Sequence, residues 1–402
     1  PGTIASTWQR AGRAGRGTDP ALVVLVAADD ALDQYLMRHP DYLFERPVEH
    51  AVIDPENPYI LARHLRCAAA EIALVPGDLA LFGERARELV PLLEQAGELV
   101  PRRQRWHWIG GLRYPAGEVD VRSASGATFR IVTPDRRTIG TIDEARAFEQ
   151  VHPGAIYLHQ GESYLVRQLD LDRRIAYVEP TAADYHTQPR VTIDLIIHRP
   201  QASRPWGPTT MTFGEVEVTT QVIGFARKQL FTDTVIDVQP LDLPPQRLQT
   251  TALWFPIPDD LEQAVRGRSL DFAGGIHAVE HAAIGVLPLF AMCDRWDIGG
   301  VSYPAHPQTG GPAVFIYDGH PGGVGITEKG YTLIEALMAA AAEVIEACPC
   351  EAGCPSCVQS PKCGNLNQPL DKAAALVLLR GLLAGGEAPA AAAAAGRPQA
   401  DV

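Results

Sequence analysis

Lysine is scarce in this sequence. The chain of 402 residues contains only four lysines, at positions 228, 329, 362 and 372. None of them stands in the Gly-Lys-Ser or Gly-Lys-Thr sequence with which a P-loop holds nucleotide phosphates. The sequence therefore predicts that this chain does not hydrolyse ATP by itself.

The sequence also lacks the apolar segments that insert into membranes. No apolar run approaches the roughly 18 residues of a membrane span, and the N-terminus does not have the pattern of a signal peptide. The net charge of −13 excludes a uniformly basic surface, although a nucleic-acid enzyme can gather its basic residues in one groove. We expect a cytoplasmic protein with no membrane partner.

The sequence also lacks an initial methionine and begins at Pro1. A dense motif follows Pro1 at once, without a preceding helix or strand to support it. We therefore interpret the chain as a fragment whose N-terminal portion is missing. Its length predicts two to four domains.

Cysteine is rare outside one cluster. Five of the seven cysteines lie between Cys348 and Cys363. Clustered thiols in a chain without a signal peptide favour metal over an extracellular disulfide framework. A closed set of four thiolates predicts structural zinc. Two sets fit the spacing: Cys348, Cys350, Cys354 and Cys357, or the last three of these with Cys363.

A basic motif opens the chain, and it has the form Gln-x-x-Gly-Arg-x-x-Arg. It comprises Gln9, Gly12, Arg13 and Arg16. Two guanidinium groups three residues apart can lie on one side of a helical turn and clamp a γ-phosphate. An exposed basic helix start is the structural alternative. The apolar run Ala21 to Ala27 that follows is typical of a buried parallel strand.

This octet resembles motif VI of superfamily two helicases. The resemblance gives Arg13 and Arg16 the places of the arginine fingers and Gln9 that of the leading glutamine. It implies that ATP and Mg²⁺ are bound in the full-length enzyme, whose Walker A lysine and acidic box would be encoded upstream of Pro1.

The remaining pattern predicts a multidomain chain of α/β and α+β class. Helical periodicity followed by a short β-wing at residues 102–109 suggests a winged helix, and short alternating strands follow it. We predict these units: the end of a RecA-like motor domain (1–54), a winged-helix-like domain (55–116), a small β-rich domain (117–200), an α+β zinc-binding domain (201–385) and a disordered tail (386–402).

The segment from Cys348 to Lys372 closely resembles the C-terminal zinc-binding domain of MrfA-type DNA-repair helicases. The similarity continues upstream through His277 to Cys293 and back to residues 54–59. The resemblance favours the compact set of four cysteines. It implies a 3′ to 5′ translocase on DNA that is single-stranded or carries a 3′ overhang, with the zinc domain over the DNA path.

A second class of function is suggested by His277-x-x-Glu280-His281, which has the form of an inverted zinc-peptidase motif. Its third ligand could be Glu343, Glu346 or Glu351. The apolar surroundings of the two histidines favour packed core histidines instead. A third hypothesis is a non-catalytic zinc-containing module that binds DNA.

The predicted wing carries guanidinium groups beside aromatic rings. Arg103, Arg105 and Trp106 combine the charge and the stacking surface that bind single-stranded DNA. An ordinary exposed β-hairpin would show the same composition. We retain these three residues as candidate DNA contacts.

Two further segments imitate nucleotide-binding motifs. Residues 143–146, Asp-Glu-Ala-Arg, match a Walker B box, but their position after motif VI and their acidic first turn favour an ordinary helix start. The Gly-rich stretch 318–325 lacks the spacing of a phosphate-binding loop. We interpret it as a tight turn.

Overall fold

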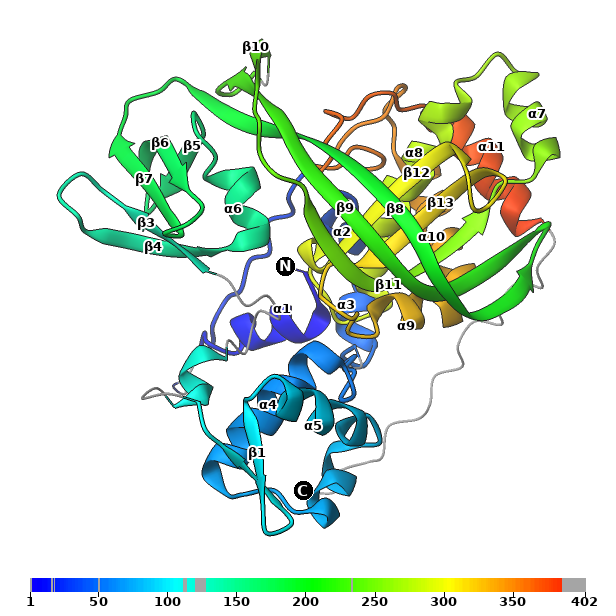
Figure 1. The fold of residues 1–402 in the computed structure, drawn as a ribbon. Coiled ribbons are helices and arrows are strands. Elements are labelled where there is room, and N and C mark those ends of the chain that lie inside the picture. Colours follow the sequence, from blue (N-terminus) through cyan, green and yellow to red (C-terminus); the bar gives the residue numbers. More distant parts are fainter. Residues whose placement is uncertain are drawn as a thin grey trace.

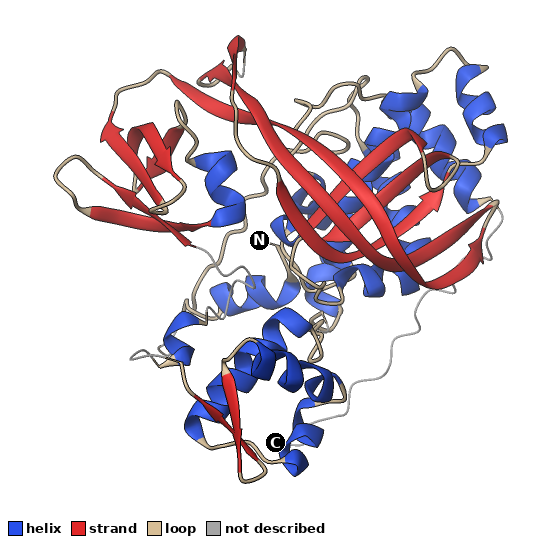
Figure 2. Ribbon diagram, viewed as in Figure 1, coloured by secondary structure: helices blue, strands red, loops and turns tan. Residues whose placement is uncertain are grey.

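The computed structural model describes residues 2–15, 17, 19–49, 51–110, 114–119, 128–232 and 234–384. Its largest unit is an antiparallel sheet with helices packed on one face (Figures 1 and 2). The six strands are β8 (Tyr185–Trp206), β9 (Thr209–Gln229), β10 (Val235–Pro240), β11 (Gln246–Pro256), β12 (Ile298–His306) and β13 (Gly311–Asp318).

Strand β9 organises this sheet. One edge of β9 pairs with β8 along its whole length, and the other edge pairs first with β11 and then with β10. The sheet continues from β11 through β13 to β12. The domain boundary predicted at residue 200 lies inside β8, where Pro200 is opposite Gly214 of β9. The boundary was placed too late because one strand and its pairing partner cannot be divided between two units.

Five helices accompany the large sheet. They are α7 (Asp259–Arg266), α8 (Phe272–Val286), α9 (Ile326–Thr332), α10 (Ile334–Ala347) and α11 (Lys372–Leu383). The central helix, α8, is buried almost all round and carries glycines where α11 approaches. A Cβ atom on Gly275 would come within 2.6 Å of the Cβ atom of Ala374. Close approach of two helices therefore requires glycine at this position.

Helix α8 and the short 3₁₀ helix η3 (Leu287–Leu289) after it form an unusually apolar stretch. Residues Phe272–Leu289 are long and apolar enough to cross a membrane by length and composition, but 89% of the stretch is buried inside the structure. That burial is typical of the core helix of a soluble protein. The expectation that no apolar run approaches the length of a membrane span is therefore corrected for this stretch, whose apolar residues are interrupted by two histidines and a glutamate.

A second sheet of five strands lies between residues 128 and 180. Its strands are β3 (Thr128–Val132), β4 (Thr138–Asp143), β5 (Ile156–His159), β6 (Glu162–Asp170) and β7 (Ile175–Pro180), in the order β4-β3-β7-β6-β5. Helix α6 (Glu144–Gln150) begins directly after Asp143, its N-cap residue. The interpretation of residues 143–146 as an ordinary helix start is therefore confirmed.

The helical segments after residue 55 form a compact unit with a β-hairpin (Figure 1). Its elements are α4 (Pro58–Glu71), η1 (Pro76–Phe82), α5 (Arg85–Gln95), β1 (Leu99–Arg102), β2 (Arg105–Trp108) and η2 (Pro115–Glu118). Gly83 has a φ of +90° and separates η1 from α5.

The N-terminal part contains α1 (Ile4–Ala11), α2 (Ala31–Arg38) and α3 (Pro40–Glu45). The strand predicted over Ala21 to Ala27 is not formed. Residues 21–28 have no regular secondary structure, and the exposed fractions of Leu22 and Val26 are 86% and 84%. A buried strand needs neighbouring strands for its backbone hydrogen bonds, and none of the strands in the described ranges pairs with this segment.

Candidate metal centre and nucleic-acid interface

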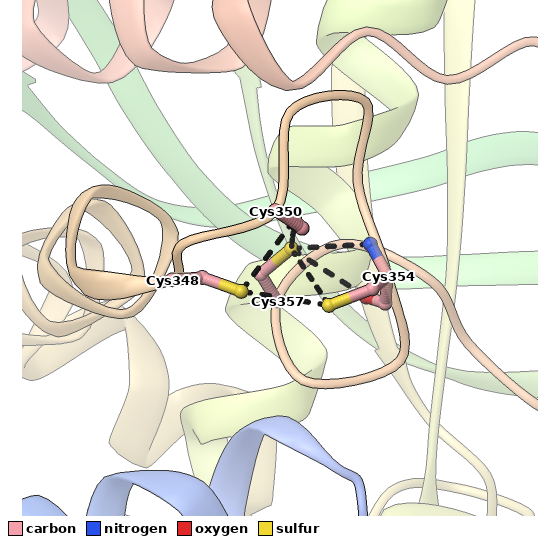
Figure 3. Close-up of side chains that lie close together, drawn as sticks. All are labelled: Cys348, Cys350, Cys354 and Cys357. Atoms are coloured by element: carbon pink, nitrogen blue, oxygen red, sulfur yellow. Dashed lines mark hydrogen bonds between the residues drawn. The ribbon is translucent and has the colours of Figure 1, made fainter.

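Four cysteine side chains from one loop point toward a common centre (Figure 3). They are Cys348, Cys350, Cys354 and Cys357, whose sulfur atoms all lie within 4.8 Å of one another. The loop joins the end of α10 to the segment that leads into α11. The turn within it is closed by hydrogen bonds from the backbone N–H groups of Cys357 and Val358 to the carbonyl oxygen of Cys354.

The spacing of the four sulfurs fits tetrahedral zinc. Neighbouring Sγ atoms are 3.4 Å apart for Cys348 and Cys354, 3.5 Å for Cys350 and Cys357, and 3.9 Å for Cys354 and Cys357. A Zn–S bond of about 2.3 Å in tetrahedral geometry separates two sulfurs by roughly 3.8 Å. All four cysteines are free rather than disulfide-bonded. The donor set therefore fits a closed, all-thiolate zinc site.

Positive charge is supplied to this group from α11. Lys372 is 8% exposed, and its Nζ atom donates to the carbonyl oxygens of Cys348 at 2.7 Å and Cys350 at 2.6 Å. The same Nζ lies 3.6 Å from the sulfur of Cys350. Burial opposes ionisation of the Cys350 thiol, but hydrogen bonds from the neighbouring cysteine sulfurs outweigh it and lower its pKa to about 7. At Cys350 the thiolate form that binds metal is therefore favoured, whereas burial raises the pKa of Cys354 and Cys357.

The fifth clustered cysteine lies elsewhere. The sulfur of Cys363 is 3.5 Å from Nε2 of His277, and His281 completes a second group of three potential ligands. The structure therefore brings together the compact set of four cysteines, and it places Cys363 with the two histidines of α8.

None of the three glutamates proposed as a third ligand in the peptidase hypothesis joins the two histidines in this group. Glu343 is 3.1 Å from Nε2 of His39, Glu346 accepts from Arg380, and Glu351 is exposed. The thiol of Cys363 occupies the third position instead. The inverted peptidase pattern consequently lacks its carboxylate ligand in the described part of the chain.

The N-terminal motif lies at the end of α1. Gln9 is an exposed residue of the helix, and Arg13 is exposed in the turn after it. Arg16 lies outside the described residues. The helix is held at its first turn by Glu49, which accepts a hydrogen bond of 2.6 Å from the backbone of Ile4. Arg13 therefore projects from a turn rather than from the helical turn that we expected.

The chain between α1 and α2 contacts the cysteine loop. Asp29 accepts a hydrogen bond from the hydroxyl of Ser356, which lies between Cys354 and Cys357. Asp30 forms an ion pair of 2.9 Å with Arg295 and also caps α2. The segment that follows the basic motif is thus attached to the cysteine-rich unit.

The candidate DNA contacts lie on the hairpin of β1 and β2. Arg103 is at the exposed turn and Arg105 is exposed at the start of β2, whereas Trp106 is partly buried against α4 and α5. The indole N–H of Trp106 donates to Glu94 at 3.2 Å. The two arginines are accessible to a ligand, and the tryptophan contributes to the hairpin's packing.

The sequence analysis missed Asn57, which is completely buried. Its side-chain oxygen caps α4, and its Nδ2 atom donates to the carbonyl oxygens of Pro321 at 2.7 Å and Gly323 at 2.5 Å. The Gly-rich stretch 318–325 is thus a turn that receives the start of α4, in agreement with our interpretation. An asparagine before a proline at the first helical position was the available signal.

The comparisons with known proteins agree with these features. Residues 279–358 match the MrfA Zn-binding domain, and residues 53–124 match the winged helix domain of the ATP-dependent helicase HRQ1. The match to the MrfA Zn-binding domain includes all four cysteines whose sulfur atoms lie close together. The fold and the site thus define a helicase-derived region with a winged helix and a zinc-binding domain, and the cysteine cluster fits structural Zn²⁺.

Relatives match over most of this chain. It is 34% identical over 364 residues to the uncharacterized ATP-dependent helicase YprA of Bacillus subtilis, covering 89% of this chain and 48% of YprA. It is 29% identical to the ATP-dependent helicase hrq1 of Schizosaccharomyces pombe, covering 95% of this chain and 37% of that protein. The chain therefore spans about half or less of these curated relatives.

A solved structure of the DUF1998 helicase MrfA matches with a TM-score of 0.61 and 32% identity, covering 90% of this chain and 51% of that one. The crystal structure of MrfA bound to DNA matches with a TM-score of 0.55 and 31% identity, covering 95% and 50%. Over most of its length the chain is therefore similar to the C-terminal part of MrfA-type helicases.

Proposed function

We propose that this chain functions within an ATP-dependent DNA helicase that moves 3′ to 5′ and acts in DNA repair in the cytoplasm. The observation that carries the proposal is the order of its parts. A motif VI octet, a winged helix and a four-cysteine zinc domain follow one another in a single chain, and a relative of the same organisation has been crystallised with DNA.

In this proposal Cys348, Cys350, Cys354 and Cys357 bind one structural zinc ion. Four thiolates leave no open coordination position, so the ion stabilises the loop and takes no part in chemistry. The loop is attached to α11 through Lys372 and to the N-terminal part through Ser356. Zinc therefore holds the zinc-binding domain, which guides single-stranded DNA in this proposal, against the segment that carries the basic motif.

Gln9, Arg13 and Arg16 act at the nucleotide. Arginine side chains stay charged and present a planar fork, which suits the charge that spreads over a transferring phosphoryl group. Bound ATP and Mg²⁺ would supply the phosphoryl chemistry. The exposure of Gln9 and Arg13 supports this role, because both side chains are accessible to the other RecA-like motor domain of the proposed helicase.

This role is tested in a protein that carries both motor domains. Arg16→Ala and Arg13→Ala should each lower DNA-stimulated ATP hydrolysis by on the order of a thousandfold, the scale of an arginine finger. Arg10→Ala is the matched control, since Arg10 is an exposed arginine of α1, next to Gln9. Near-normal turnover in the Arg13 and Arg16 variants would favour the non-catalytic DNA-binding module.

The hairpin arginines Arg103 and Arg105, supported by Trp106, contact single-stranded DNA or a 3′ overhang in this proposal. Each phosphate contact to a single strand contributes about 0.7 to the slope of log affinity against log salt. Replacing both arginines with alanine should therefore reduce that slope by about 1.4. Fluorescence anisotropy with the zinc-loaded chain measures it.

The control for DNA binding is Arg173→Ala, since Arg173 is exposed in the small β-rich unit. It should leave both affinity and slope unchanged. A slope that is equally steep in the double hairpin variant would remove the hairpin from the interface, and a chain with no affinity for DNA would contradict the proposal as a whole.

A further inference from the structure

A second group of potential metal ligands lies apart from the four cysteines. His277 and His281 project from successive turns of α8, and Cys363 approaches them from the loop before α11. All three are buried, and their ligand atoms lie within 4.8 Å of one another. Together they line a cavity of about 590 Å³.

Both imidazole rings are held in the orientation that a metal requires. Nδ1 of His277 is 2.7 Å from the carbonyl oxygen of Pro369, and Nδ1 of His281 is 2.8 Å from that of Val358. A carbonyl oxygen can only accept, so each Nδ1 carries the proton and each Nε2 presents a lone pair. A backbone carbonyl behind the ring is the usual support of a metal-binding histidine.

The thiol of Cys363 is also held in place by hydrogen bonds. The backbone N–H of Asn367 donates to the sulfur of Cys363 at 3.3 Å. The side chain of Asn367 closes the same loop through Ser360, accepting at 2.8 Å from its N–H and donating at 3.1 Å to its carbonyl oxygen. The sulfur is thereby held 3.5 Å from Nε2 of His277. The three donors are positioned before any ion arrives.

We propose that His277, His281 and Cys363 bind a second divalent transition-metal ion, of the zinc class. Imidazole and thiolate are the donors that zinc prefers, and bonds of about 2.0 Å to nitrogen and about 2.3 Å to sulfur separate tetrahedral donor atoms by roughly 3.5 Å. The distance between Nε2 of His277 and the sulfur of Cys363 has this value.

This ion differs from the structural zinc in its coordination. Three protein ligands leave one position for water or another small ligand, and the cavity provides room for it. The carboxyl group of Glu280 lines the same cavity between the two histidines. A thiolate at Cys363 would offset part of the charge of a divalent ion. The helicase proposal requires none of these residues, so the two proposals stand independently.

Metal content of the whole chain tests the second site. After zinc loading and removal of loosely bound ions, the wild-type chain should contain two zinc ions. Cys363→Ala and His281→Asn should each retain one, the structural ion, while Cys67→Ser is the matched control and should retain two. A wild-type chain that binds a single zinc under saturating conditions would overturn the proposal.

A measurement on the wild-type chain alone guards against a variant that fails to fold. X-ray absorption at the zinc edge should show a mixed shell of sulfur and nitrogen, because only the second site supplies imidazole. An all-sulfur shell would overturn the second site and leave the four-cysteine site intact. A mixed shell together with no affinity for DNA would separate failure of the helicase proposal from failure of this one.

Discussion

Two buried charged side chains in this protein, Lys372 and Asp318, are held by hydrogen bonds to specific partners. Lys372 donates to two carbonyl oxygens of the cysteine loop. The carboxyl group of Asp318 is completely buried and accepts from the hydroxyl groups of Thr251 at 3.0 Å and Thr327 at 2.9 Å. Burial raises the pKa of Asp318 despite these hydrogen bonds. Such groups make stability depend on local contacts that composition does not reveal.

The ion pair between His320 and Asp297 predicts a pH dependence of stability. Nε2 of His320 lies 3.1 Å from Oδ1 of Asp297, and this hydrogen bond raises the pKa of His320 above its ordinary value of 6.5. The contribution of this ion pair to the free energy of unfolding is fully present below pH 6.5. It is lost as the pH rises through the raised pKa of His320 in the folded state.

His320→Gln should therefore lower the free energy of unfolding by about 1 kcal/mol more near pH 6 than near pH 8.5. Urea denaturation at the two pH values measures the difference. The control is His64→Gln, on the exposed part of α4. An equal loss at both pH values would show that His320 contributes packing rather than charge.

At the scale of elements, the side chain of Asn57 attaches the start of α4 to the large sheet. Asn57 caps α4 and donates to two carbonyl oxygens of the turn after β13. Replacing it with alanine removes a cap worth about 1 kcal/mol and leaves buried carbonyl groups unsatisfied, at about 1–3 kcal/mol. Asn57→Ala should therefore lower the free energy of unfolding by roughly 2–4 kcal/mol.

The variant Asn57→Ser separates the two contributions. The hydroxyl oxygen of serine can still cap the helix. Serine has no amide group, however, so it cannot donate to the carbonyl oxygens of the turn. It should be more stable than Asn57→Ala by about 1 kcal/mol in denaturant unfolding. Equal stability of the two variants would mean that the cap contributes nothing here.

Elements with their own periodicity could be predicted from the sequence, and elements defined by distant partners could not. Helices α8 and α10 follow from apolar spacing, and Leu333 separates α9 from α10. The apolar residues 21–27 have the composition of a strand but no pairing partner in the described ranges. The length of β8 was missed because alternation alone does not say where a strand's partner ends.

The two groups of potential metal ligands also differ in whether they could be predicted from the sequence. The four-cysteine group could be predicted because its ligands are close in sequence. The position of Cys363 beside His277 could not, since 86 residues separate them. Similarly, nothing in the sequence indicated that Lys372 contacts the cysteine loop or that Trp106 uses its indole N–H within the hairpin.

At the scale of the whole molecule, residues 19–30 connect the basic motif to the cysteine loop through Asp29 and Ser356 and to η4 (Arg295–Asp297) through Asp30. Ser356→Ala should release part of this segment. Hydrogen exchange at the backbone of Ala28, which donates to Asp33 at 2.8 Å, should become about tenfold faster if the lost contact is worth about 1.4 kcal/mol.

The matched control is Ser203→Ala, on β8, which should leave exchange at Ala28 unchanged. An unchanged rate in Ser356→Ala would show that the ion pair of Asp30 and Arg295 alone holds the segment. In that case Arg295→Ala should produce the faster exchange.

The attachment of Asp29 to Ser356 also has a thermodynamic consequence. In the proposed helicase, a nucleotide that favours one position of the basic motif would change the free energy of the cysteine loop through this connection. By reciprocity, a ligand that stabilises the loop must alter nucleotide affinity by the same factor. Zinc content and DNA occupancy would then be effectors of the proposed motor.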